Sequence, residues 1–269
     1  MILHPLRPAP PGSSETIPAW KAVAAAQKQS APSWWLVAQP DHAALAGDLA
    51  AQFAAPGFQI SDREVLWAIA LHDAGWAKYD GGGEAGGGQN TAPRLLRDTS
   101  GRPLSFLQAP VEMFVEAWTA SIAYAEVKAG ATGGLMVSGH FRRLAEHRLN
   151  SVEDTPDDVA RIRAFVSHET HQDETRFRRQ PRTHAELERL VDVLQFCDLL
   201  SLYLCCGSRA SVQFPQALGP RPMVLRRSGE LCRLEPSPFC KEISLGVAAR
   251  RDPLSRTEPN TCILPVLIR

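Results

Sequence analysis

Six residues with metal-ligating side chains follow one another along this chain, at intervals that match successive helices. They are His42, the adjacent pair His72 and Asp73, His140, His168 and Asp198. Imidazole and carboxylate groups are preferred donors for first-row divalent metal ions. Because most neighbours in this series are separated by about one helix and a loop, no local zinc-finger pattern can join them. Any metal site must be assembled by the tertiary structure.

Asp198 lies on a helical face that is otherwise apolar. Leu187, Val191 and Leu194 precede it at the three- and four-residue spacing of a buried helix face. An isolated carboxylate on such a face costs several kcal/mol unless it is paired or bound to a metal. We therefore expect Asp198 to have a partner inside the protein.

Two more helices carry ligand-type residues on faces predicted to be buried. His72 and Asp73 continue an apolar face that ends near Gly75, where glycine predicts a C-terminal cap. His42 follows a helix start at Pro40. Together with Asp198, these residues predict a metal site built from separate helices.

A second metal ion would need further ligands, and here the sequence leaves alternatives open. His140 is predicted to point inward from its helix, with His147 on the same face as a competitor. On the next helix either His168 or Glu169 can face the core, since both follow Phe165 by three or four residues. We favour His140 and His168.

Three short motifs resemble those of the HD superfamily of metal-dependent phosphohydrolases. They are QPDHAALAG, AIALHDAGW and LQFCDLLSLYLC, which contain His42, the pair His72 and Asp73, and Asp198. More closely, they resemble an uncharacterised bacterial family of HD-like helical proteins, over roughly residues 34 to 206. The resemblance implies that these four residues bind the first metal, with Asp73 bridging to a second metal held by His140 and His168 or Glu169.

The predicted activity is hydrolysis of a small phosphate ester by a metal-activated water. One or two divalent ions would serve as cofactor, and the same donors suit Fe, Mn, Zn, Co or Ni. Asp73 would act in catalysis as the bridging ligand, and Lys78 or His147 would protonate the leaving group. The alternatives are a di-iron oxygenase of the HD type, acting on a small polyol or phosphonate, and a non-catalytic metal-stabilised binding protein.

The composition of the chain limits the classes of partner and the compartment that we expect. Lys+Arg and Asp+Glu number 29 each, so no overall field favours nucleic acid or an anionic membrane. No apolar run approaches the roughly 20 residues that span a bilayer. The N-terminus lacks a signal-peptide core, and the six cysteines form no CxxC pair. These features predict a cytoplasmic protein with reduced thiols and a small-molecule substrate; the oligomeric state is not determined by the sequence.

The predicted fold class is mainly α: an HD-like helical bundle with a small appended antiparallel sheet. Residues 1–33 are Pro-rich and expected to be irregular, apart from a short helix at 19–29. The helical metal-binding domain spans 34–210, and 211–269 form a β-rich segment packing on the same domain. The sheet would join an N-terminal strand at 34–39 to segments 224–226, 231–234, 243–249 and 262–268.

A glycine-rich loop interrupts the predicted helical domain over residues 80–110. Its core, GGGEAGGG at Gly81–Gly88, is not a P-loop, because no Gly-Lys-Ser/Thr follows and no strand precedes it. Since the loop leaves directly from the HDAGW motif, a lid over the metal site and a plain insertion are both compatible with it.

Overall fold

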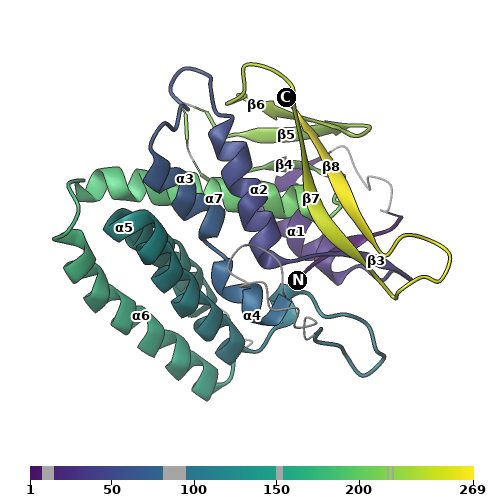
Figure 1. Ribbon diagram of the computed structural model, residues 1–269, viewed down its shortest axis with the longest axis horizontal. Coiled ribbons are helices and arrows are strands. Elements are labelled where there is room, and N and C mark those ends of the chain that lie inside the picture. Colours follow the sequence, from purple (N-terminus) through teal and green to yellow (C-terminus); the bar gives the residue numbers. More distant parts are fainter. Residues whose placement is uncertain (8–14, 81–94, 150–153, 217, 220) are drawn as a thin grey trace.

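Long helices form one half of the molecule (Figure 1). The computed structural model describes residues 1–7, 15–80, 95–149, 154–216, 218–219 and 221–269. Its helices are α1 (Ala19–Lys28), α2 (Gln39–Ala51), α3 (Arg63–Leu71), η1 (Ala74–Trp76), α4 (Ala77–Asp80), η3 (Phe106–Gln108), α5 (Val111–Leu149), α6 (Pro156–Phe177) and α7 (His184–Cys205). None of these described helices is long and apolar enough to cross a membrane.

The helices begin where side chains can satisfy their first N–H groups. The Thr155 hydroxyl accepts from the Asp158 N–H at the start of α6, and Pro156 follows at the first helical position. Thr183 and Glu186 form a capping box at the start of α7. Helix α5 is kinked at Gly130, whose φ of 65° lies in the left-handed region.

The strands form one eight-stranded mixed sheet in the order β1-β3-β7-β8-β6-β5-β4-β2. They are β1 (Ile2–Pro5), β2 (Thr16–Pro18), β3 (Trp34–Val37), β4 (Ser211–Gln213), β5 (Val224–Ser228), β6 (Leu231–Glu235), β7 (Ile243–Asp252) and β8 (Thr261–Ile268). Two pairs, β2 with β4 and β6 with β8, are parallel. The longest ladder joins β7 to β8 in antiparallel register.

The predicted fold class is therefore wrong. The chain is 52% helical and 18% strand, and its sheet is a substantial mixed layer rather than a small antiparallel appendage to a helical bundle. The strand predicted at 34–39 and the C-terminal segments are present, but β1, β2 and β4 were not foreseen. Residues 1–33, expected to be irregular, contribute two of these strands. Runs of three or four residues show no readable alternation, and their pairing depends on distant partners.

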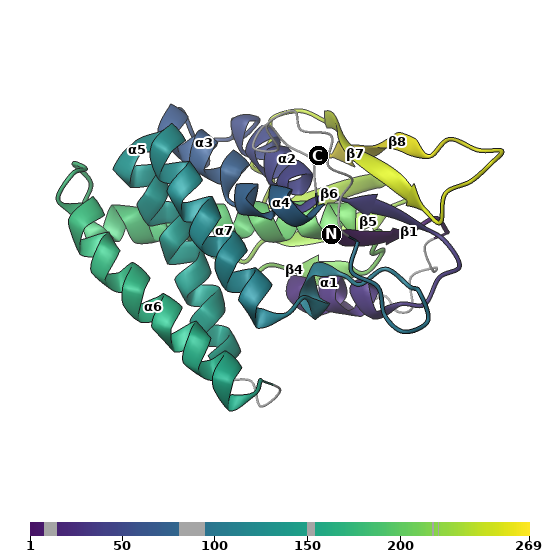
Figure 2. The ribbon, with the colours of Figure 1, turned by 60° about the horizontal axis from the view of Figure 1, so that its bottom comes forward.

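The sheet and the helices share one hydrophobic core. Leu49 of α2, Leu194 of α7 and Leu234 of β6 belong to the same buried cluster. Helices α1, α2 and α7 lie next to the sheet, whereas α5 and α6 lie farther from it, beyond α7 (Figure 2). Helix α7 contacts both strand β1 and the outer helix α5. The candidate site lies among α2, α3, α5 and α7. The Gly81–Gly88 segment, predicted as a lid or insertion, lies outside the described residues.

Candidate metal centre

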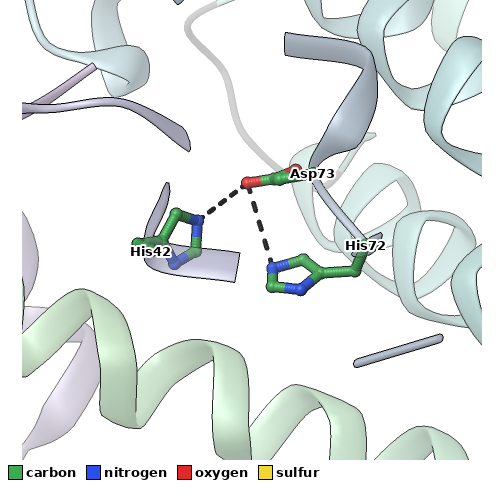
Figure 3. Close-up of side chains that lie close together, drawn as sticks. All are labelled: His42, His72 and Asp73. Carbon is green, nitrogen blue, oxygen red and sulfur yellow. Dashed lines mark hydrogen bonds and ion pairs between the residues drawn. The ribbon is translucent and has the colours of Figure 1, made fainter. Parts of the chain in front are cut away.

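Four helical elements bring five of the predicted ligands together inside the protein. His42 lies on α2, His72 directly follows α3, His140 lies on α5 and Asp198 on α7. Asp73 precedes η1, and Figure 3 shows its carboxylate between the rings of His42 and His72. The three imidazoles are buried, and the two carboxylates are only slightly exposed. We call these five residues the His/Asp cluster.

Gly75 shapes the backbone beside the cluster, but not as the predicted C-terminal cap. Helix α3 ends at Leu71, and Asp73 has φ of −110° and ψ of 20°, which starts a new 3-10 turn. Gly75 does not have a positive φ. A Cβ atom there would lie 2.1 Å from the Ala117 carbonyl oxygen, and the Gly75 N–H donates to the Ser121 hydroxyl over 2.9 Å. Glycine is needed because α5 packs directly on this backbone.

Neighbouring donor atoms of the His/Asp cluster lie close enough to share an ion, in two overlapping groups of three that have His72 in common. His42 Nε2 is 2.9 Å from Asp73 Oδ2, and His72 Nε2 is 3.9 Å from the same oxygen. Asp198 Oδ1 lies 3.2 Å from His72 Nε2, and Asp198 Oδ2 lies 3.9 Å from His140 Nε2. Two donors that each lie 2.0–2.2 Å from a metal can be at most about 4.4 Å apart. All of these separations meet that limit.

The hydrogen bonding of His72 favours a cation at this position. Its Nδ1 lies 2.8 Å from the Ile69 carbonyl oxygen, which can only accept, so Nδ1 carries the hydrogen. Nε2 then presents a lone pair to the carboxylates of Asp73 and Asp198 unless a proton or a metal ion lies there. A backbone carbonyl bonded to the outer nitrogen is typical of metal-ligating histidines.

The pKa values of the metal-free cluster also show that its carboxylates favour a positive charge at His72. Burial lowers the pKa of His72, but the hydrogen bond to Asp198 and the charges of Asp73 and Asp198 outweigh it and raise that pKa to about 9. Burial likewise raises the pKa of Asp198, yet the bond to His72 and the nearby imidazoles bring it down to about 2. Without a metal, a proton on His72 takes the place of the cation.

His140 is the least satisfied member of the cluster. Burial lowers its pKa to about 4, so the ring is neutral near pH 7. Its Nδ1 is buried and has no hydrogen-bond partner in the described structure. Since no hydrogen bond from the described residues to Nδ1 fixes the tautomer, Nε2, which lies 3.9 Å from Asp198 Oδ2, can present a lone pair to a metal ion.

The remaining predicted ligand, His168, lies apart from the cluster. Its side chain is 61% exposed on α6, whereas the side chain of its competitor Glu169 is only 2% exposed. Glu169 faces inward as an ion-pair partner of Arg176, which also binds Asp173 and Glu126. We call these four residues the Arg176 cluster. Among the described residues, neither His168 nor Glu169 is brought to the His/Asp cluster.

The two residues predicted to protonate a leaving group lie on the surface. The Lys78 ammonium is paired with Glu116, which also accepts from the Tyr79 hydroxyl. His147 is exposed near the end of α5. Neither belongs to a group of potential metal ligands among the described residues. The geometry therefore assigns neither of them to the His/Asp cluster.

One contact of the cluster was not predicted as part of the site. The Ser201 hydroxyl lies 2.9 Å from His42 Nδ1 and is fully buried. The available signal was its position three residues after Asp198 on the same apolar stripe of α7. A serine on a buried face is common, so the sequence alone gave no reason to assign it a role.

The family model described as protein of unknown function (DUF3891) matches residues 26–251. The chain belongs to the DUF3891 family. The matched residues include every member of the His/Asp cluster and α2 through α7. No curated protein and no solved structure matches the chain. The DUF3891 description assigns no activity.

Proposed function

We propose that this DUF3891 protein binds one divalent metal ion in the His/Asp cluster and uses it to hydrolyse a small phosphate ester. The observation that carries the proposal is the orientation of His72. Its Nδ1 is bonded to the Ile69 carbonyl, and its Nε2 faces the carboxylates of Asp73 and Asp198. Two carboxylates and neutral imidazoles would match the charge of a divalent ion.

A single metal ion is favoured by the residues available. His42, His72, Asp73 and Asp198 supply two nitrogen and two oxygen donors, and His140 stands next to Asp198 as a fifth. The predicted second-metal ligand His168 is exposed on α6. The potential ligands form two overlapping groups that share His72, namely His42, His72 and Asp73, and His72, His140 and Asp198. The described residues contain no group of three apart from these. We therefore propose a mononuclear centre, which also gives less support to a di-iron oxygenase.

A bound divalent ion would supply Lewis acidity and an acidified water. The chain would supply orientation and access. The three histidines are buried, whereas the side chains of Asp73 and Asp198 are 9% and 13% exposed. A substrate would thus approach from the carboxylate side. Asp73 offers Oδ2 to the imidazoles, and its other oxygen would accept a proton from the attacking water.

The assignment to hydrolysis also rests on the resemblance of the HDAGW motif and its flanking motifs to HD phosphohydrolases. The compartment is proposed from the cysteines: all six, including the buried Cys197 and Cys205, are free thiols. Reduced thiols are typical of the cytoplasm. A cytoplasmic small phosphate ester is the substrate class that we propose.

The decisive experiment compares phosphate release with dioxygen uptake. Protein loaded with manganese or cobalt should release phosphate from a generic phosphomonoester or cleave a phosphodiester, independently of dioxygen. Asp73→Asn should abolish this activity, because it removes a ligand charge with little change of shape. Asp192→Asn is a matched control, since Asp192 lies on α7 but pairs with Arg143 at the surface.

Two outcomes would overturn the hydrolase proposal. Oxygen-dependent turnover by iron-loaded protein, with no phosphate release, would identify an oxygenase. Tight metal binding with neither activity would identify a metal-stabilised binding protein. Equal phosphate release by wild type and Asp73→Asn would show that the activity does not come from this site.

A further inference from the structure

Ser201 connects two of the proposed metal ligands that come from different helices. Its Oγ lies 2.9 Å from Nδ1 of His42 on α2 and 2.8 Å from the backbone carbonyl oxygen of Asp198 on α7. Ser201 and His42 are fully buried, and Asp198 is partly buried. The contact spans 159 positions in the sequence, so it exists only because α2 and α7 pack together.

The direction of these hydrogen bonds follows from the chemistry of the groups. The Asp198 carbonyl oxygen can only accept, and a helical serine commonly donates to a carbonyl three or four residues earlier. A hydroxyl has one hydrogen. When Ser201 donates it to Asp198, the Ser201 oxygen is left to accept from His42, which places the imidazole hydrogen on Nδ1.

The hydrogen on Nδ1 determines the state of the other ring nitrogen of His42, Nε2. With its hydrogen on Nδ1, the ring has a lone pair on Nε2, which lies 2.9 Å from Asp73 Oδ2. The opposite tautomer would place a hydrogen on Nε2 and satisfy Asp73 without any cation. Ser201 therefore favours the form of His42 that can ligate a metal, as the Ile69 carbonyl does for His72.

We propose that Ser201 is a positioning residue of the metal centre, which holds His42 as the tautomer with a free Nε2 and links it to the backbone of Asp198. The proposal rests on the metal-binding function proposed above. It adds a residue that touches neither the ion nor the substrate. Hydrogen-bonded partners of this kind typically change metal affinity by about 10–100-fold when they are removed.

The test uses Co²⁺ alone as the probe. Its affinity for wild type, Ser201→Ala and Ser201→Thr is measured by competition with a chromophoric chelator, and the visible spectrum of each cobalt complex is recorded. We expect Ser201→Ala to bind cobalt about 10–100-fold more weakly, with an altered spectrum because His42 is no longer fixed. Ser201→Thr keeps the hydroxyl and should recover affinity and spectrum.

Ser138→Ala is the matched control for a generic packing or hydrogen-bond defect. Ser138 is as buried as Ser201, and its hydroxyl donates to Asp173 over 2.8 Å, in the Arg176 cluster. Ser201→Ala loses two hydrogen bonds of a buried hydroxyl and Ser138→Ala loses one, so the unfolding midpoints of both metal-free proteins should fall. Only Ser201→Ala should change cobalt affinity and spectrum.

The possible failures can be told apart. If wild type binds no cobalt, zinc or manganese, the metal site itself is refuted. If wild type binds cobalt and Ser201→Ala binds it equally well with the same spectrum, only the positioning role is refuted. If Ser138→Ala weakens cobalt binding as much as Ser201→Ala does, the effect is one of general stability. If Ser201→Ala does not fold, Ser201→Thr decides the test. Wild-type cobalt affinity of Ser201→Thr supports the proposal, whereas a Ser201→Thr protein that folds like wild type but has lost its cobalt affinity overturns it.

Discussion

The Arg176 cluster and the His/Asp cluster differ in how their charges are compensated. In the Arg176 cluster, the carboxylates of Glu169, Asp173 and Glu126 are all bound by the guanidinium of Arg176. Further arginines, Arg142 and Arg179, pair with Asp173 and Glu126. Every buried carboxylate in this cluster thus has a permanent cation from the chain.

The His/Asp cluster has no such cation. In the described part of the chain, the ion-pair partners of Asp73 and Asp198 are imidazoles alone, and the hydrogen on Nδ1 of His72 is already donated to the Ile69 carbonyl. The free-energy cost of burying a charge is offset only when an opposite charge or well-placed hydrogen bonds lie next to it. A structural ion network is thus neutralised within the chain, whereas a ligand site is recognised by buried charges that the chain's own residues do not neutralise.

The largest expected effect is loss of metal from ligand variants of the His/Asp cluster. His72→Ala and Asp198→Ala should each reduce metal content from about one ion per chain to nearly none, because each removes a donor from a small set. Elemental analysis after desalting measures this. His168→Ala should keep full occupancy, since that side chain is exposed. If the His72→Ala and Asp198→Ala proteins had wild-type metal content, the His/Asp cluster would not be the metal site and would not differ from the Arg176 cluster in this respect.

The next largest effect should come from the Arg176 cluster and concern stability alone. Arg176→Ala leaves the buried Glu169 without its cation and should cost about 3–5 kcal/mol of unfolding free energy. Chemical denaturation of the metal-free protein checks this, with the exposed Arg178→Ala expected to stay within about 0.5 kcal/mol of wild type. Metal content per folded chain should not change. Loss of metal from Arg176→Ala would show that the two clusters are coupled.

Metal removal should produce a smaller change in stability. A ligand that binds only the folded state adds about 2.7 kcal/mol when its concentration is 100 times its Kd. We therefore expect manganese or zinc at that excess to raise the unfolding free energy of wild type by this amount, and a chelator to reverse it. Asp198→Ala should show no such increment. Equal stabilisation of both proteins would point to metal binding elsewhere.

The smallest effect is expected at Lys78. Its ammonium pairs with Glu116 on the surface, and exposed pairs contribute about 0–1 kcal/mol. Lys78→Ala should therefore keep the metal and nearly all of the stability, which elemental analysis and denaturation can measure on one sample. A large drop in turnover with metal and fold intact would restore Lys78 as an acid or substrate-binding group of the proposed reaction.

Local sequence patterns determined much of the helical framework. The apolar stripe of α7 predicted a buried face at Asp198, and the strands near Trp34 and after Gly207 were visible as β-rich runs. Such patterns work because neighbours three and four residues apart share a helix face, and neighbours two apart share a strand face. They indicate which side chains are buried without identifying their partners.

Only the tertiary structure decided those partners. The sequence left His168 and Glu169 as alternatives and favoured His168, whereas in the structure Glu169 faces inward as the ion-pair partner of Arg176. Ser201 acquired its contact with His42 through the packing of α2 on α7. The sheet reaches eight strands because β1 pairs with β3 and β2 pairs with β4, which lies in the last third of the chain. Periodicity is a local property, whereas charge compensation and strand pairing depend on groups that folding brings together from distant positions.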